Sequence, residues 1–400
     1  MKVVIVGNGV AGTLSAKAIR DNDAEASIIL LSAERHPYYP RPNLIEYIAG
    51  VLSRPRLFAF PADWPDERRI DLRLSTPAKA VHPAAKEVEL AGGERLSYDK
   101  LLLADGASAF VPPIRGVEKR GVFTLRTLDD AEAILDFARS HPRAAVVGGG
   151  LLGLEIARAL QMRGAEVEVI EFLPYLLPRQ LDAAGSAVLK AQIEARGIVV
   201  RVGLATEEIF GEAEVRGLRF KDGSETPTDM VLIAAGVKPN LALAREAGLA
   251  VDRGVLVNDR METGVSDIYA AGDGTQHGGR LYGIIPASFE QARIAAAAIQ
   301  GRDGLYKGTV PSNSLKVSGL ALTSVGVVNP EGSGFEELRA SNPEAGVYKK
   351  IVLQDGALVG AVWMGTQAGV PDLVKAVNQR KQAASRKHDL LREGFDFKSL

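Results

Sequence analysis

The sequence predicts an α/β fold in which two dinucleotide-binding units are followed by a smaller C-terminal α+β domain. A strand, a glycine-rich turn and a helix occur in this order after residue 2 and again after residue 144. Each unit later contains an apolar run that ends in a glycine, Gly106 in the first and Gly236 in the second. From Pro311 onward the chain changes to strand patterns. The two units are therefore predicted to be Rossmann-like.

The first unit begins with an apolar, β-branched run at residues 2–6, which is typical of a buried parallel strand. The three glycines that follow have distinct predicted roles. The first permits a sharp turn, the second lets a pyrophosphate approach the backbone, and the third lets the helix pack on the strand. These glycines, with the first helical residues whose N–H groups would face the phosphates, are Gly7, Gly9, Gly12, Val10 and Ala11.

The second unit repeats this pattern. A strand over residues 144–147 leads into three glycines, a helix predicted over residues 154–162 and a strand over residues 166–170. The residues predicted to surround a second pyrophosphate are Gly148, Gly150, Leu151, Leu152 and Gly153. One such glycine pattern is weak support for nucleotide binding, whereas two in one chain are strong support.

An acidic residue follows the second strand of each unit. Glu34 lies about 20 residues beyond Gly12, and Glu171 has a similar spacing from Gly153. A carboxylate at this place can accept hydrogen bonds from the hydroxyls of an adenosine ribose. Glu171 favours NAD over NADP because a 2′-phosphate needs a cation, although Arg179 leaves NADPH open as an alternative.

The remaining patterns divide the chain. A loop over residues 36–43 is rich in proline and aromatic residues, and its tyrosines, Tyr38 and Tyr39, are expected to pack in the interior. A helix is expected to begin near Leu128, and an Ala-rich helix is expected over residues 286–301. Strand patterns cover residues 315–328 and 347–362, and a charged tail follows Pro371. The predicted domains are residues 1–112 with 241–310, residues 113–240, and residues 311–400.

Composition excludes several classes of function. The 48 basic and 49 acidic residues nearly cancel, which argues against a nucleic-acid-binding surface. The absence of cysteine excludes disulfides, cysteine-bound iron–sulfur clusters and a redox-active dithiol. The five histidines show no metal-ligand spacing, so no metal is predicted. No apolar run approaches the roughly 20 residues that span a bilayer, so a cytoplasmic location is expected.

The strand pattern over residues 266–273, which ends in Gly272 and Asp273, completes an order of motifs that resembles a known superfamily. These are the flavoproteins with two dinucleotide-binding domains, the pyridine nucleotide:disulfide oxidoreductases. Residues 39–42, 48–50 and 314–319 are most similar to the NADH:rubredoxin reductases and to the flavin portion of NADH-dependent nitrite reductases. The resemblance covers the whole chain.

The resemblance implies FAD in the first unit and NAD(H) in the second. It implies that Glu34 binds the adenosine ribose, that Arg41 with Pro42 lies near the pyrophosphate or flavin, and that Asp273 binds the ribitol chain. A helix that begins near Pro286 would point its N-terminus at the pyrimidine side of the flavin. Where most members of the family have Ala-Thr-Gly, this chain has Asp105 in place of the threonine and keeps Gly106, and Glu46 replaces the histidine or lysine of relatives.

Two side chains are implied near the reacting ends of the cofactors. Glu155 resembles the family glutamate that faces the nicotinamide. Lys316 is interpreted either as a flavin-side residue, from the match of its segment, or as a surface lysine of a strand.

The absence of cysteine removes the thiol-dependent branches of the superfamily, so the leading hypothesis is an NADH-dependent FAD oxidoreductase that passes electrons to a protein carrier. Rubredoxin, a ferredoxin or an iron–sulfur subunit is the expected partner. The alternatives are a peripheral NADH:quinone reductase, an NADH-sensing flavoprotein without turnover, and a homodimer or a subunit of a redox complex. A basic surface for an acidic partner is expected on the tail, at Lys375, Arg380, Lys381, Arg386 and Lys387.

Overall fold

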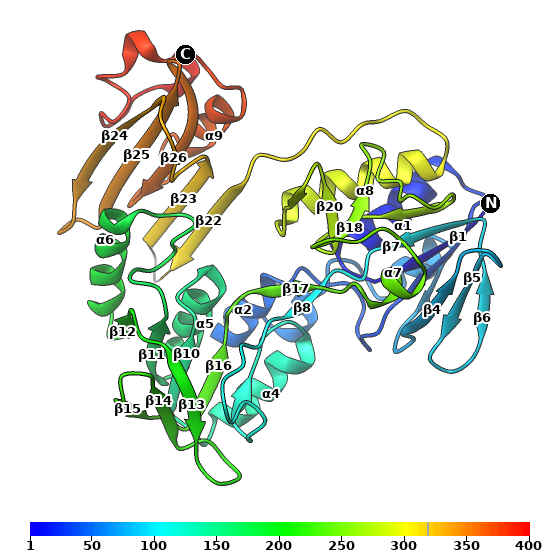
Figure 1. The fold of residues 1–400 in the computed structure, drawn as a ribbon, viewed down its shortest axis with the longest axis horizontal. Coiled ribbons are helices and arrows are strands. Elements are labelled where there is room, and N and C mark those ends of the chain that lie inside the picture. Colours follow the sequence, from blue (N-terminus) through cyan, green and yellow to red (C-terminus); the bar gives the residue numbers. More distant parts are fainter. Residues whose placement is uncertain (318–319) are drawn as a thin grey trace.

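The computed structural model describes residues 1–317 and 320–400, with residues 315–317 described by their backbone alone (Figure 1). The first unit is built on a five-stranded parallel sheet in the order β19-β7-β1-β2-β3. Helices α1 (Val10–Asn22) and α8 (Ile285–Ile299) pack against each other beside this sheet. Its strands are β1 (Lys2–Val6), β2 (Ser27–Leu31), β3 (Ile70–Arg73), β7 (Lys100–Leu103) and β19 (Ile268–Ala270).

The second unit has the same design, with a five-stranded parallel sheet in the order β12-β11-β10-β16-β9. Its strands are β9 (Val122–Phe123), β10 (Arg143–Val147), β11 (Glu166–Glu171), β12 (Val199–Val202) and β16 (Met230–Ile233). Its helices are α4 (Leu128–Ala138), α5 (Leu151–Met162) and α6 (Ala183–Glu194). Helix α5 begins three residues before the predicted Leu154, because Gly150 is extended and acts as its N-cap.

Small sheets, short helices and 3₁₀ turns connect or extend the main elements of the chain. An antiparallel ribbon of β8 (Ala107–Ala109) and β17 (Val237–Pro239) runs between them (Figure 1). The other small sheets contain β4 (Ala78–His82), β5 (Glu87–Leu90), β6 (Arg95–Ser97), β13 (Thr206–Phe210), β14 (Gly217–Phe220), β15 (Glu225–Pro227), β18 (Val255–Val257), β20 (Thr275–His277) and β21 (Arg280–Leu281). Short helices are α3 (Trp64–Glu67) and α7 (Ala242–Glu246), and 3₁₀ turns cover Arg54–Leu57, Ala384–Arg386 and Phe397–Ser399.

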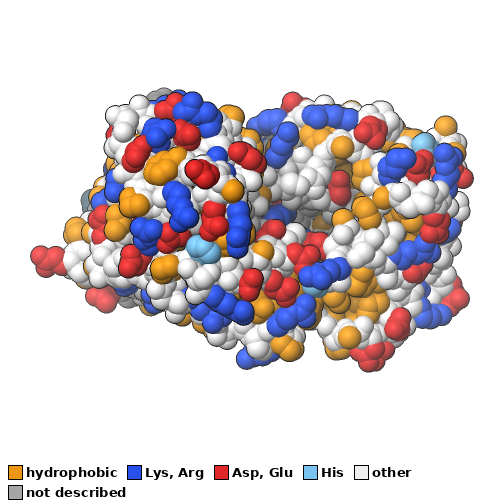
Figure 2. Space-filling model, turned by 90° about the horizontal axis from the view of Figure 1, so that it is seen from below, with side chains coloured by type: hydrophobic (Ala, Val, Ile, Leu, Met, Phe, Trp, Pro, Cys, Tyr) orange, Lys and Arg blue, Asp and Glu red, His pale blue; other side chains and the backbone are white. Residues whose placement is uncertain are grey.

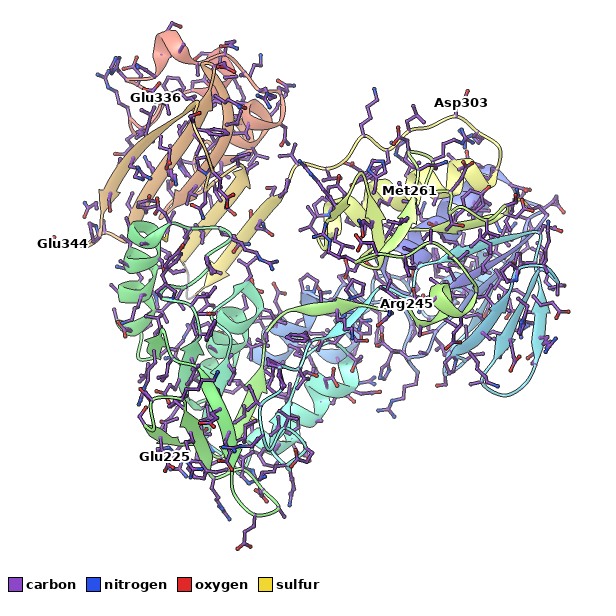
Figure 3. All side chains as sticks on the ribbon, viewed as in Figure 1. Glu225, Arg245, Met261, Asp303, Glu336 and Glu344 are labelled. Atoms are coloured by element: carbon purple, nitrogen blue, oxygen red, sulfur yellow. The ribbon has the colours of Figure 1, made fainter. Side chains whose placement is uncertain are left out.

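The C-terminal part is an antiparallel sheet in the order β22-β23-β26-β25-β24. The strand pattern over residues 347–362 is divided by a turn at Asp355 and Gly356, and β24 had no counterpart in the sequence patterns. The elements are β22 (Ser312–Val317), β23 (Leu320–Gly326), β24 (Phe335–Asn342), β25 (Val347–Gln354), β26 (Ala357–Met364) and α9 (Val370–Asn378). In Figure 3, Glu336 and Glu344 mark this sheet, Glu225 marks the second unit, and Met261 lies in the first unit.

A buried ionic cluster joins the C-terminal sheet to the second unit. The Lys350 side chain is only 2% exposed, and its Nζ lies 3.2 Å from Asp182 of α6 and 2.7 Å from Glu337. Tyr348 donates its hydroxyl proton to the same Asp182 carboxylate. Since a buried ammonium is costly unless it is paired, this cluster fixes where the sheet docks.

A segment of the first unit packs into the second. We call residues 36–58 the bridging arm; it contains α2 (Asn43–Ala49). Leu44 and Ile48 of the arm are buried in the core cluster that also holds Leu154 and Leu160 of α5. At the end of α2, Arg163 donates hydrogen bonds to the carbonyls of Ile48 and Tyr47, at 2.7 and 3.3 Å. The arm therefore ties the two units together through both apolar and polar contacts.

Candidate functional site

Two glycine turns of the same construction end the central strands of the two sheets. A Cβ built on Gly7 would lie 2.2 Å from the carbonyl oxygen of Ala104, and one on Gly12 would lie 1.8 Å from that of Gly7. In the second unit a Cβ on Gly148 would lie 2.4 Å from the carbonyl oxygen of Ala234, and one on Gly153 would lie 1.9 Å from that of Gly148. Both turns therefore require glycine for close packing.

The middle glycine of each turn faces open space. In the part of the chain that the structure describes, a Cβ on Gly9 or on Gly150 would meet no heavy atom within 4 Å. Each of these glycines is the N-cap of the helix that follows, α1 or α5, and neither receives a side-chain cap. The free N–H groups of Val10, Ala11, Leu151 and Leu152 thus lie at two open helix N-termini. These are fitting places for two pyrophosphates.

The carboxyl ends of β1, β7 and β19 bring the predicted FAD residues of three chain segments together. Gly272 donates its N–H to Gln291 of α8 at 2.8 Å, and a Cβ on Gly274 would lie 3.0 Å from the Gly106 carbonyl oxygen. Asp273 accepts a hydrogen bond from Arg126 at 2.9 Å. Helix α8 begins at Ile285 with Pro286 in its first turn, one residue before its predicted start.

Glu34 lies in a second polar cluster near the same edge. Arg41 donates to one Glu34 oxygen at 2.5 Å and to the carbonyl of Arg126 at 2.6 Å. The Tyr39 hydroxyl donates to the other Glu34 oxygen and accepts from Arg41. Pro42 follows directly as the residue before α2. The predicted pair Glu34 and Arg41 is thus brought together, although here the two side chains bind each other.

Glu171 is held by backbone groups of its own unit. Its carboxylate accepts N–H hydrogen bonds from Gly149 at 2.7 Å and from Leu173 at 2.8 Å. These contacts fix the carboxylate beside the second glycine turn, and each oxygen keeps a lone pair for a ligand hydroxyl. Phe172 next to it is exposed, as is Arg179.

Two carboxyl groups near the turns have perturbed acidity. Burial raises the pKa of Asp105 to about 7 and also raises the pKa of Glu155, on α5, to about 7. Both groups are therefore partly protonated near neutral pH. Groups with such shifts concentrate at functional sites, which makes both of interest for proton handling.

Several predicted residues lie away from this arrangement. Glu46 is exposed on α2, and the Lys316 side chain lies outside the described residues. In the tail, Lys387 pairs with Glu336 at 3.0 Å, Arg386 pairs with Asp389 at 3.6 Å, and Lys381 binds the Leu400 carbonyl. These internal pairs reduce the positive electrostatic potential that the tail presents to an acidic partner.

Some polar contacts of the site were missed by the sequence patterns. Arg126, Gln291 and Asn240 bind Asp273, the Gly272 N–H and the Asp105 carbonyl respectively. Tyr39 was expected only to pack, and it also carries hydrogen bonds. Arg126 lies 147 positions from Asp273, and Asn240 lies 135 positions from Asp105, so no local spacing signals these two contacts.

The two units face each other across a hollow, which Figure 2 shows from below between the body at the left and the body at the right. Basic and acidic side chains are interspersed over this face. Among the residues that the structure describes, no group of three or more His, Cys, Asp or Glu side chains is placed to hold a metal ion. In the same part of the chain, no helix is both long and apolar enough to cross a membrane.

The sequence matches the family model described as pyridine nucleotide-disulphide oxidoreductase over residues 1–299. The chain belongs to this family. Residues 311–381 match the model of the rubredoxin NAD+ reductase C-terminal domain. The predicted resemblance and the predicted α/β fold class are therefore confirmed, and FAD and NAD(H) are the cofactors of this family.

Relatives and solved structures agree with this assignment. The NADH-rubredoxin oxidoreductase of Clostridium acetobutylicum is 32% identical over 95% of this chain and 95% of that protein. A crystal structure of that enzyme superposes with a TM-score of 0.80 at 31% identity, covering 95% of this chain and 96% of that one. A covalent putidaredoxin reductase–putidaredoxin complex gives a TM-score of 0.86 at 26% identity, over 95% of this chain and 93% of the other.

Other relatives are longer. A nitrite reductase [NAD(P)H] of Bacillus subtilis is 38% identical over 91% of this chain but over only 45% of its own length. An assimilatory nitrate reductase electron transfer subunit of the same organism is 33% identical over 98% of this chain and 51% of its own length. The chain thus spans about half the length of these two curated relatives.

Proposed function

We propose that the chain is an NADH-dependent FAD oxidoreductase that passes electrons to a protein carrier such as rubredoxin, a ferredoxin or an iron–sulfur subunit. One observation carries this proposal: two glycine turns of the same geometry, open at Gly9 and at Gly150, each with an acid nearby, in a chain without cysteine. The division into residues 1–112 with 241–310, residues 113–240 and residues 311–400 is part of the proposal.

The first unit would hold FAD. The open helix N-terminus beyond Gly9 takes the pyrophosphate, and Glu34 takes the adenosine ribose. Arg41 and Arg126, which pair with Glu34 and Asp273, would exchange these carboxylates for phosphate oxygens when FAD binds. Asp273 would then bind ribitol hydroxyls. The N-terminus of α8 at Ile285 favours negative charge on the pyrimidine end of the flavin.

The second unit would hold NADH in the same manner. The helix N-terminus beyond Gly150 takes the pyrophosphate, and Glu171 takes the adenosine ribose. A carboxylate at this place selects a free 2′-hydroxyl and disfavours a 2′-phosphate. Glu155 follows Gly153 on α5 by two residues, where its partly protonated carboxyl would face the nicotinamide end.

The chemistry divides between cofactor and protein. When bound, FAD supplies a centre that accepts a hydride from NADH and releases electrons singly. The chain's own residues would bind both dinucleotides and orient their reactive ends toward each other. Because the chain has no cysteine, it offers no dithiol to receive the electrons. We therefore propose a carrier outside the chain as the acceptor, which agrees with the NADH-rubredoxin oxidoreductase and the putidaredoxin reductase among its relatives and structural neighbours.

The test is anaerobic stopped-flow mixing of the FAD-loaded protein with NADH and, separately, with NADPH, followed by mixing with rubredoxin or ferredoxin. We expect fast bleaching of the flavin by NADH, slower bleaching by NADPH, and rapid reoxidation by the carrier. If the flavin stays oxidised with both nucleotides, the enzymatic proposal is wrong. Slow reduction combined with a large NADH-dependent change in sedimentation would support the sensor alternative, and reoxidation by a quinone alone would support the quinone reductase.

A further inference from the structure

Tyr39 lies where the two units meet. Its side chain is almost fully buried, and its ring packs in the core cluster that contains Leu44 of the bridging arm and Leu128 of α4. The ring also carries the Arg41 guanidinium at 5.1 Å from its centroid. Tyr39 thus contacts residues of both units through its ring alone.

The Tyr39 hydroxyl makes hydrogen bonds with side chains of the first unit and with a backbone group of the second. It donates to the Glu34 carboxylate and accepts from Arg41 Nη1 at 2.7 Å. It also accepts the N–H of Leu128 at 2.8 Å. Leu128 is the first residue of α4, whose early N–H groups have no partner inside the helix. One hydroxyl therefore joins the predicted ribose acid of the first unit to a helix N-terminus of the second.

The protonation state of Tyr39 suits this role. Burial is the largest cause of a raised pKa of the Tyr39 hydroxyl, and the neighbouring Glu34 carboxylate adds to it, while Arg41 and the Leu128 N–H oppose it. The hydroxyl therefore keeps its proton at physiological pH and remains a donor to Glu34.

Other polar contacts hold the bridging arm on α4 without reaching Glu34. His36 Nε2 lies 2.8 Å from Asp129, and Arg35, which directly precedes the arm, pairs with the same carboxylate at 2.9 Å. Arg54 pairs with Glu132 at 2.7 Å. These contacts hold the arm on α4. Tyr39 differs from them because it also contacts Glu34 and Arg41 directly, so a ligand of these two side chains would affect it.

We propose that Tyr39 is a positioning residue that couples FAD binding in the first unit to NAD(H) binding in the second. The inference rests on the proposed function. When FAD engages Glu34 and Arg41, the Tyr39 hydroxyl restricts both side chains and stays fixed to the first turn of α4. Occupancy of one unit then biases the placement of the other. By linkage, each ligand changes the affinity of the other by the same factor.

The neighbouring Tyr38 supplies a matched control. Within the described part of the chain its hydroxyl makes no hydrogen bond, and its ring lies 6.3 Å from that of Phe60. Tyr39→Phe and Tyr38→Phe each remove one hydroxyl from adjacent positions and keep the ring. The FAD-free protein is titrated with FAD in the absence and in the presence of saturating NAD+, and the ratio of the two dissociation constants is the coupling factor.

We expect a coupling factor of about 5 or more in the wild type and in Tyr38→Phe, and a factor below about 2 in Tyr39→Phe. A wild-type factor of 1, or a Tyr39→Phe factor equal to that of the wild type, overturns the proposal. A wild type that binds no FAD refutes the proposed function instead.

Hydrogen exchange in the FAD-free protein tests the Tyr39 contact without either ligand. The Leu128 amide should exchange about 10-fold faster in Tyr39→Phe than in Tyr38→Phe, because its acceptor is gone. Equal exchange in the two variants contradicts the assigned role. Circular dichroism of both variants checks that they are folded.

Discussion

Gly150→Ala is expected to weaken NADH binding by the second unit while leaving the folding of that unit almost unchanged. The backbone of Gly150 is extended, with φ of −79°, which alanine adopts freely, and the new methyl would meet no heavy atom of the described residues within 4 Å. The cost to the protein itself is limited to the weaker helix cap, about 0.5–1 kcal/mol. The methyl would instead occupy the space proposed for the NADH pyrophosphate. Overpacking of this kind costs about 1–3 kcal/mol, which is about 5- to 150-fold in the dissociation constant.

The assay is the dependence of the anaerobic flavin reduction rate on NADH concentration. Gly150→Ala should raise the half-saturating NADH concentration by this factor and keep its FAD. Gly9→Ala, at φ of −86° and equally free of protein contacts, should weaken FAD binding instead. Gly153→Ala is the folding control, because its methyl would collide with the Gly148 carbonyl. An unchanged NADH dependence in Gly150→Ala, or loss of its FAD, refutes the reasoning.

Three further substitutions test the electrostatics. Hydrogen bonds from Gly185, Tyr348 and Lys350 outweigh burial and lower the pKa of Asp182 to about 2, so its stabilisation is present above about pH 4 and is lost as the pH falls toward 2. In urea denaturation over this range the wild type should lose about 2 kcal/mol more of its unfolding free energy than Asp182→Asn; equal losses would contradict the pairing. Burial raises the pKa of Asp105 to about 7, so ionisation destabilises the FAD-free protein as the pH rises from about 4 to 7. Asp105→Asn should be more stable than the wild type at about pH 8, by on the order of 1–2 kcal/mol in thermal denaturation, and equal stability would show that Asp105 ionises without cost. Glu171→Gln loses one acceptor oxygen beside Gly149 and should raise the half-saturating NADH concentration about 10-fold. It should also reduce the ratio by which the protein prefers NADH to NADPH. An unchanged ratio would show that Glu171 does not bind the ribose.

The sequence predicts the fold well where local patterns carry the information. The glycine turns after β1 and β10 are recognisable because close backbone contacts, such as that of Gly12 with the Gly7 carbonyl, admit no side chain. The apolar runs of β7 and β16 are recognisable because buried parallel strands are apolar on both faces. Strand β24 was missed because most of its residues are polar and do not alternate with apolar ones. It lies at the edge of the sheet and has no fully apolar face.

The site is predicted less completely because its polar contacts are not local. Arg126 binds Asp273 across 147 positions of the chain, and the Leu128 N–H binds the Tyr39 hydroxyl across 89. Spacing rules extend over about 20 residues, so they find Glu34 and Glu171 but not the groups that hold them. The packing of the bridging arm into the second unit is likewise a tertiary contact, and the sequence of the short helix α2 does not predict it.

The two acids proposed to bind ribose, Glu34 and Glu171, have similar places in the sequence but are held differently. Glu171 accepts hydrogen bonds from Gly149 and Leu173, so its placement depends only on its own unit. Glu34 is held by Arg41 and Tyr39, which in turn bind the Arg126 carbonyl and the Leu128 N–H at the start of α4. A displacement of α4 therefore reaches Glu34 through direct hydrogen bonds, whereas it reaches Glu171 only through the packing of the second unit.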